Sequence, residues 1–117
     1  MSIALLFPGQ GAQTPGMLHR LPDHPAVRQT LEEASTTLGY DVLTLDTPGA
    51  LRSTVSVQLA LLTAGVAAAR ALEAEGVIPE AVAGLSVGAF AAAVHAQVIT
   101  LADGIRLKHL HLWSGRE

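Results

Sequence analysis

Apolar and polar positions along the chain predict strands that alternate with helices. Residues 2–7 are a short apolar run closed by Pro8-Gly9, a pattern typical of a buried strand that ends in a loop. Residues 81–83 form a second short β-prone run, and an alanine-rich segment follows at 89–96. Helical spacing dominates the long interval between the two runs. This order indicates an α/β fold.

The first helix is predicted from its boundary residues. Asp23 or His24 can serve as the N-cap, with Pro25 at the first helical position. Apolar residues then recur at helical spacing until Gly39, a plausible C-terminal stop. Residues 40–45 alternate enough to predict a short strand or extended segment.

The longest predicted helix begins at Ser56, its candidate N-cap, and runs to Gly76. Between Val57 and Leu72 it is apolar nearly all round, which favours a position in the centre of a domain. Gln58, in the first turn, is a polar exception: it either caps its own helix or points into a site. A last helix is predicted from Leu101, with Thr100 as its N-cap.

Composition narrows the class of protein. A chain of 117 residues and 12.1 kDa has the size of one domain, and half of its residues are apolar while 3% are aromatic. A net charge of −3 and no basic cluster argue against nucleic-acid binding. The chain has no cysteine and no visible signal peptide, so we expect a cytoplasmic protein.

One alternative is a membrane span. Residues 81–102 carry no Asp, Glu, Lys or Arg, and this stretch is long enough to cross a bilayer. Ser86, His95, Gln97 and Thr100 lie within it, its hydrophobicity comes mostly from alanine, and it starts with a β-prone segment. We therefore expect no membrane insertion.

The clearest chemical signal is Gly84-Leu85-Ser86-Val87-Gly88, which fits G-x-S-x-G between a predicted strand and a predicted helix. Such a nucleophile elbow exposes the serine hydroxyl on a sharp turn, and its glycines allow strand and helix to approach. The N–H of Val87 would lie at a helix N-terminus, where it can stabilise an oxyanion. An ordinary glycine-rich turn is the alternative interpretation.

A second informative segment is the loop of residues 8–16, named here the glutamine loop. It contains Gln10 and Gln13 together with three glycines and two prolines, and it follows the first predicted strand. It is either a solvated surface turn or a loop that lends a backbone N–H and an amide to a reaction centre.

A serine nucleophile needs a base, and the histidines offer no clear one. His95 lies nine residues beyond Ser86, too far along a helix to reach its hydroxyl, and is expected to be partly exposed. Asp103 with His109 or His111 has the order of a hydrolase triad, but residues six or eight apart on one helix point in different directions. No spacing typical of a metal site is present.

Taken in order, residues 7–13 (FPGQGAQ), 57–62 (VQLALL) and 84–88 (GLSVG) resemble the malonyl-CoA:acyl-carrier-protein transacylases and related acyltransferase domains, up to about Leu107. The resemblance implies part of a three-layer α/β acyltransferase core, helix-rich, with a short parallel sheet. It implies transfer of malonyl from coenzyme A to the phosphopantetheine thiol of a carrier protein. The thioester is a substrate, and no cofactor is implied.

The same resemblance implies residue roles. Ser86 matches the nucleophile, the backbone N–H groups of Gln10 and Val87 match the oxyanion hole, and Gln58 matches a glutamine near the site. The family's carboxylate-binding arginine falls on His111, so malonyl selectivity requires Arg106 or Arg116 to substitute.

Two further positions narrow the resemblance. Leu85 and Ala89 replace a histidine and an acidic residue that usually flank the elbow. With residues 17–22, they make the chain look more like the transacylase subunit of malonate decarboxylase, whose other subunits would then be partners.

The general-base histidine and a small inserted domain belong to a second half of the family's fold. We therefore expect residues 1–117 to be the N-terminal part of the large domain, with a truncated or altered segment from Lys108 onward. Incomplete cover of the central helix would favour self-association. A serine esterase or thioesterase, and a non-catalytic fragment that docks a carrier protein or subunit, are the alternative functions.

Overall fold

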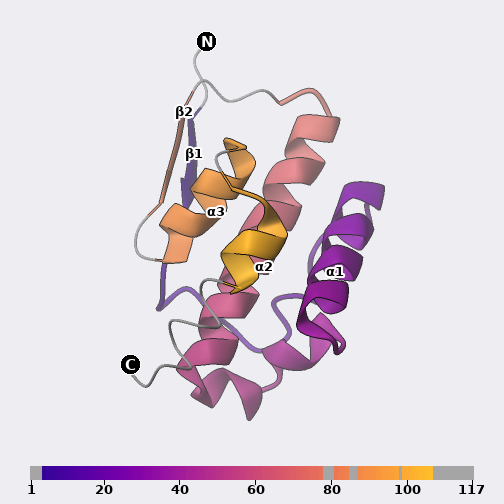
Figure 1. Cartoon of the computed structure of the whole chain (residues 1–117), viewed down its shortest axis with the longest axis vertical. Helices are drawn as coiled ribbons and strands as arrows, with labels where there is room; N and C mark the ends of the chain where they lie inside the picture. The colour runs from indigo at the N-terminus through magenta and orange to yellow at the C-terminus, as the bar shows by residue number, and fades with distance from the viewer. Residues whose placement is uncertain (1–3, 78–80, 85–86, 98, 107–117) are drawn as a thin grey trace.

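The computed structural model describes residues 4–77, 81–84, 87–97 and 99–106, with 81–84 and 87–90 described by their backbone. Figure 1 shows the arrangement, and residues 101–106 add a further helical segment. The elements are β1 (Ala4–Phe7), α1 (Pro25–Leu38), the 3₁₀ helices η1 (Val42–Asp46) and η2 (Ala50–Arg52), α2 (Thr54–Ala74), β2 (Ala81–Gly84) and α3 (Val87–His95).

The two strands form a parallel pair. Ala4 lies opposite Ala81 and Phe7 lies opposite Gly84. A parallel pair needs a long crossover, which here contains α1 and α2. The predicted short parallel sheet and α/β class are confirmed.

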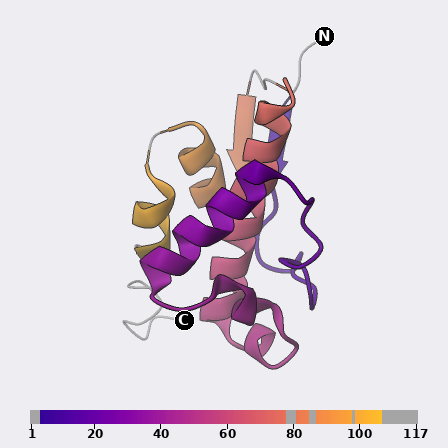
Figure 2. The ribbon, with the colours of Figure 1, turned by 90° about the vertical axis from the view of Figure 1, so that its right-hand side faces the viewer.

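The described helices lie on one side of this sheet. In Figure 1 the sheet, α3, α2 and α1 follow one another across the molecule, and Figure 2 shows α1 in front of α2 with the strands behind. Phe7 is buried toward the helices, whereas Leu6 on the other face is 80% exposed. A second helical layer, which would complete the three-layer core, stays a prediction.

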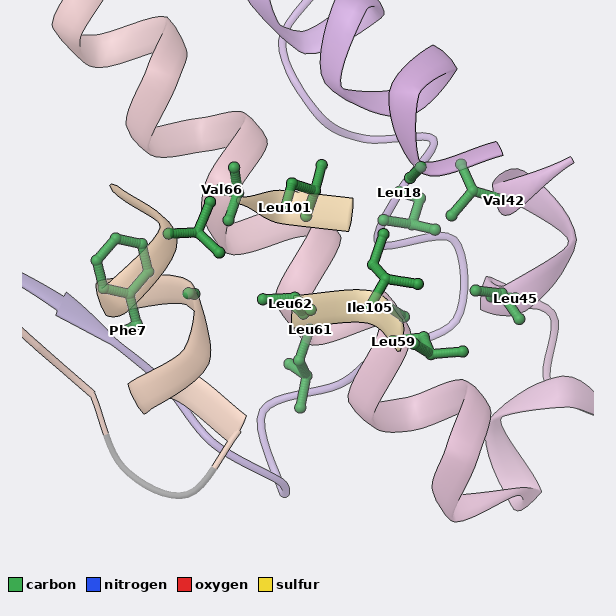
Figure 3. Close-up of a cluster of buried hydrophobic side chains, with 14 of the residues drawn as sticks. Phe7, Leu18, Val42, Leu45, Leu59, Leu61, Leu62, Val66, Leu101 and Ile105 are labelled. Atoms are coloured by element: carbon green, nitrogen blue, oxygen red, sulfur yellow. The ribbon is translucent and has the colours of Figure 1, made fainter. Parts of the chain in front are cut away.

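Helix α2 is the centre of the packing, as the sequence predicts. Its apolar side chains meet those of the strand, η1, α3 and residues 101–106 (Figure 3). At Gly65 a Cβ would come within 3.0 Å of Phe7 Cδ1 and 3.3 Å of Ala91 Cβ, so only a glycine allows this close approach without displacement. The core includes Phe7, Leu18, Val42, Leu45, Leu59, Leu61, Leu62, Val66, Leu101 and Ile105.

Helix α2 is also long and apolar enough to cross a membrane, with a mean hydropathy of 1.6. Of that window 61% is buried inside the structure, as expected of a core helix. The stretch 81–102, considered above as a span, contains β2 followed by α3 in its described part and is therefore not one continuous helix.

The boundaries of α1 follow the prediction. The ring Nδ1 of His24 accepts a hydrogen bond from the Ala26 N–H at 3.0 Å, and Pro25 is the first helical residue. Gly39 ends the helix with a φ of 83°, and its N–H donates to Ser35 O at 2.8 Å. The predicted cap at Thr100 is likewise confirmed, since its hydroxyl accepts from the Asp103 N–H.

The start of α2 differs from the prediction. Ser53, not Ser56, is the N-cap: its hydroxyl accepts from the Ser56 N–H at 3.4 Å, and the helix begins at Thr54. Ser53 and Ser56 are both suitable N-cap residues. With the cap at Ser53, residues 54–56 belong to the helix. The helix ends at Ala74, and Gly76 follows with a φ of 90°.

The predicted strand at residues 40–45 is wrong. Val42–Asp46 is a 3₁₀ helix, because the Asp41 carboxylate accepts from the Leu43 N–H and Ser35 Oγ accepts from the Val42 N–H. These side-chain acceptors satisfy N–H groups that a strand would need to pair with a neighbour. Val42 and Leu45, three apart, then share the buried face of the 3₁₀ turn.

Candidate active site

The two informative segments leave the sheet at the same edge. Because Phe7 and Gly84 are paired in parallel strands, the glutamine loop and the segment that follows β2 both begin at the carboxyl ends of the strands. Ligands of open α/β sheets bind at this edge. The register therefore brings together two motifs that are more than seventy residues apart in the sequence.

The strand and helix expected on either side of the elbow are present. β2 ends at Gly84 and α3 begins at Val87, one residue after Ser86. The first N–H groups of an α-helix have no partner within the helix, so the Val87 backbone is at a position suited to an anion. Leu85 and Ser86 lie outside the described residues, and the geometry of the serine stays a prediction.

Gln10 and Gln58 are in contact. Gln58 Nε2 donates to Gln10 Oε1 at 3.4 Å, so Gln58 points to the glutamine loop and does not cap its own helix. The Gln58 side chain is 8% exposed, and its Oε1 is buried without a hydrogen-bond partner in the described part of the chain. Two residues selected independently from the sequence thus lie side by side.

Hydrogen bonds within the glutamine loop and its continuation fix the backbone. Gln13 Oε1 accepts from the Gly11 N–H at 2.7 Å, and Gly11 has a φ of 114° that favours glycine. Arg20 Nη1 donates to Pro15 O at 2.6 Å. The side-chain amides of Gln10 and Gln13 therefore both have hydrogen-bond partners, and most of the loop, Gln10 included, is exposed at the surface.

Asp46 holds the segment that follows the loop, a role that no local sequence pattern indicates. Its Oδ2 accepts from the N–H of Leu18 at 2.9 Å and of His19 at 3.2 Å, and it lies 2.7 Å from His19 Nδ1. Its backbone oxygen accepts from the Gly16 N–H at 2.9 Å. Burial raises the pKa of Asp46, but the His19 side chain, the two backbone N–H groups and the charge of His19 together hold that pKa below its usual value.

His95 is a partly exposed residue of α3, as predicted, but its ring is buried. Its side chain is 4% exposed, with Nε2 at 3.3 Å from Glu73 Oε2, and its ring is tilted against Phe7. The ring is buried because this face of α3 packs onto α2 and the end of β1.

The candidate carboxylate-binding residues are not assembled with Gln10 and Gln58 in the described structure. Arg106 has a largely exposed side chain and pairs with Asp103 at 3.7 Å, three residues earlier on the same helix. His109, His111 and Arg116 lie outside the described residues. In the part of the chain that the structure describes, no group of three His, Asp or Glu side chains could hold a metal ion.

A strand, a G-x-S-x-G turn and a helix, beside the loop of a parallel neighbour, are the features of α/β enzymes with a serine nucleophile. The chain belongs to the acyl transferase domain family, whose model matches residues 4–115. This confirms the family resemblance.

Individual relatives agree with the family. A malonyl CoA-acyl carrier protein transacylase of Escherichia coli K12 is 45% identical over 109 residues, which are 89% of this chain and 35% of the relative. The structure of an acyl carrier protein S-malonyltransferase from Vibrio cholerae matches with a TM-score of 0.85 and 41% identity, over 95% of this chain and 38% of that one.

A third match is a complex: a type II polyketide acyl-carrier protein with its malonyl-transacylase, 43% identical, with a TM-score of 0.84 over 94% of this chain and 37% of that one. The chain thus spans little more than a third of the length of the proteins it matches. None of these three relatives is named as a malonate decarboxylase subunit. The cytoplasmic location of this chain stays a prediction.

Proposed function

We propose that this chain contributes the nucleophile and the oxyanion hole of a malonyl-CoA:acyl-carrier-protein transacylase. The observation that carries the proposal is the register of the sheet, with Phe7 opposite Gly84. It directs the Gln10 loop and the G-x-S-x-G turn to one edge. The names of the relatives supply the substrate class, malonyl-CoA, and the acceptor, an acyl carrier protein.

In the proposed reaction, the Ser86 oxygen attacks the thioester carbonyl of malonyl-CoA while its proton passes to a base. The N–H groups of Gln10 and Val87 stabilise the oxyanion. The C–S bond then breaks, coenzyme A leaves with the proton, and a malonyl ester remains on Ser86. The thiol of the carrier protein attacks this ester in the reverse sense, which regenerates Ser86.

Several parts of this assignment rest on the family resemblance. The resemblance places the base histidine in the portion of the relatives that this chain does not span. It makes Arg106, His111 and Arg116 the candidates for binding the malonyl carboxylate. We propose that the chain is the N-terminal part of the large domain, and that Gln58 positions Gln10.

The malonate decarboxylase context rests on Leu85, Ala89 and residues 17–22 alone. We therefore propose a transacylase that serves a free acyl carrier protein. If the chain worked within a malonate decarboxylase, it would use the carrier subunit of that complex in preference to a carrier protein of fatty-acid or polyketide synthesis.

The test is transfer from malonyl-CoA to a carrier protein, followed by mass spectrometry of the carrier. We expect malonyl on the carrier that bears phosphopantetheine and none on the same carrier without it. Release of free malonate with no carrier dependence would instead identify a thioesterase. Binding of the carrier with no transfer, unchanged in Ser86→Ala, would identify a docking fragment.

A further inference from the structure

Asp46 is the one carboxylate among the described residues that is buried on all sides, with an exposed fraction of 2%. A buried carboxylate is costly unless its oxygens are satisfied. Three donors from a segment 27 or 28 residues earlier in the chain converge on one of these oxygens, Oδ2. None of these donors belongs to its own 3₁₀ helix.

These contacts converge on the residues that follow the glutamine loop. The backbone oxygen of Asp46 holds Gly16, and its carboxylate holds Leu18 and His19. Leu18 is also buried in the core, at 1% exposure. The segment is therefore bonded at three residues to Asp46 of η1, and η1 packs on α2.

The other end of the loop is fixed independently. Phe7 is anchored in β1, and Gln58 on α2 contacts Gln10. Arg20, next to His19, donates to the backbone of Pro15 and to the hydroxyl of Thr14. A displacement of residues 16–20 would thus also move Thr14 and Pro15, which Arg20 contacts, and with them the glutamine loop that carries Gln10.

We propose that Asp46, together with His19, is a positioning residue that sets the place of the Gln10 backbone N–H in the oxyanion hole. This inference rests on the proposed function for its catalytic consequence, but its structural part stands on the hydrogen bonds above. Asp46 acts through the loop and touches no substrate.

The matched pair of variants is Asp46→Asn and Asp41→Asn. Both residues belong to η1 or its cap, but the exposed Asp41 accepts from Leu43 within η1 and has no hydrogen bond to residues 14–20. Asp46→Asn keeps the size of the side chain but removes the negative charge from the group that accepts the three hydrogen bonds.

The first readout is NMR of the isotopically labelled chain. Asp46→Asn should shift the amide resonances of Gln10 and Gly11 and speed amide exchange at Leu18 and His19, while Gly39 and Gly104 stay unchanged. Asp41→Asn should leave Gln10 and Gly11 in place. Unmoved Gln10 and Gly11 resonances in folded Asp46→Asn would overturn the proposal.

The second readout is the rate of malonyl-ester formation on the chain at saturating malonyl-CoA. Because small misplacements of reacting groups are costly, we expect a loss of about tenfold or more for Asp46→Asn and less than about twofold for Asp41→Asn. Equal rates would overturn the catalytic part. If the unsubstituted chain forms no ester at all, the proposed function fails. The NMR comparison still tests whether Asp46 sets the position of the glutamine loop.

Discussion

Asp46 shows how one side chain can join two distant parts of this chain. Its carboxylate is ionised in the fold because His19 and two backbone N–H groups stabilise the charge more than burial opposes it. A carboxyl whose pKa is lowered by folding stabilises the folded state above its unfolded pKa. That contribution is lost as the pH falls through the folded pKa.

The corresponding prediction concerns acid stability. The difference in unfolding free energy between the unsubstituted chain and Asp46→Asn should be constant above about pH 5. It should shrink below about pH 4, where the Asp46 carboxyl of the unfolded chain takes up a proton while the folded one, with its lowered pKa, is still ionised. Urea unfolding at a series of pH values measures this difference. His19 is the titratable group bonded to Asp46, so the series is repeated in a His19→Gln background.

A difference that stays constant down to the acid limit would contradict the role of the ionised carboxylate. A difference that disappears in the His19→Gln background would assign the effect to His19.

Single residues differ in how far the sequence reveals them. Gln10 and Gln58 stand out because amides are unusual in a glycine-rich loop and on an apolar helix, and the structure places them in contact. Asp46 does not stand out, since an aspartate before Thr47-Pro48-Gly49 has the appearance of an ordinary turn residue. Its partners lie too far away in the sequence for any local pattern to indicate them.

At the scale of elements, the capping residues are the best predictors of where a helix begins and ends. His24, Pro25 and Gly39 set the limits of α1 as the sequence predicts, because their preferences are local and are not overridden by packing. The prediction of an extended segment at residues 40–45 is wrong, because the alternation of apolar residues also fits a 3₁₀ helix with two buried positions. The 3₁₀ helix is favoured over a strand because the side chains of Ser35 and Asp41 accept hydrogen bonds from the backbone N–H groups of Val42 and Leu43.

The two serines at the start of α2 give a direct test of its cap. Ser53→Ala should lower the unfolding free energy by about 1 kcal/mol, because the Ser56 N–H loses its acceptor. Ser56→Ala should have little effect or a small stabilising one, since alanine is the better helix former inside the first turn. Urea unfolding at neutral pH distinguishes them. The reverse order would place the cap at Ser56.

At the scale of the whole molecule, the central helix is better covered than the sequence suggests. Many of the α2 side chains are buried, from Val57 to Ala71, between α1, α3 and the 3₁₀ helices. The most exposed large apolar side chain among the described residues is instead Leu6, on the face of the parallel sheet that no described helix covers. Parallel sheets are normally covered on both faces, so this face is the place where another surface is expected.

We therefore predict that self-association of the isolated chain depends on Leu6. Leu6→Thr should shift the chain toward monomer, because it removes apolar surface and keeps strand propensity. Leu72→Ala is the control, since Leu72 is exposed on α2. Size exclusion with light scattering over a range of concentrations measures this. A monomer at every concentration, or a dependence on Leu72 alone, would contradict the prediction.

The fold class and the family are accessible from the sequence because three ordered motifs specify a loop after a strand, a central helix and an elbow along most of the chain. The register that joins them is not, since the pairing of Phe7 with Gly84 depends on how α1 and α2 pack across the crossover. The sequence likewise does not show that the described helices lie on one side of the sheet (Figure 2).

The central claim is that Ser86 accepts a malonyl group from coenzyme A. The most direct measurement is the intact mass of the chain after incubation with malonyl-CoA, compared between the unsubstituted chain and Ser86→Ala, with free malonate plus coenzyme A as the control. We expect one malonyl adduct per unsubstituted chain, located on the peptide that contains Ser86, and none on Ser86→Ala or in the control. No adduct on the unsubstituted chain, or an equal adduct on Ser86→Ala, would contradict the account.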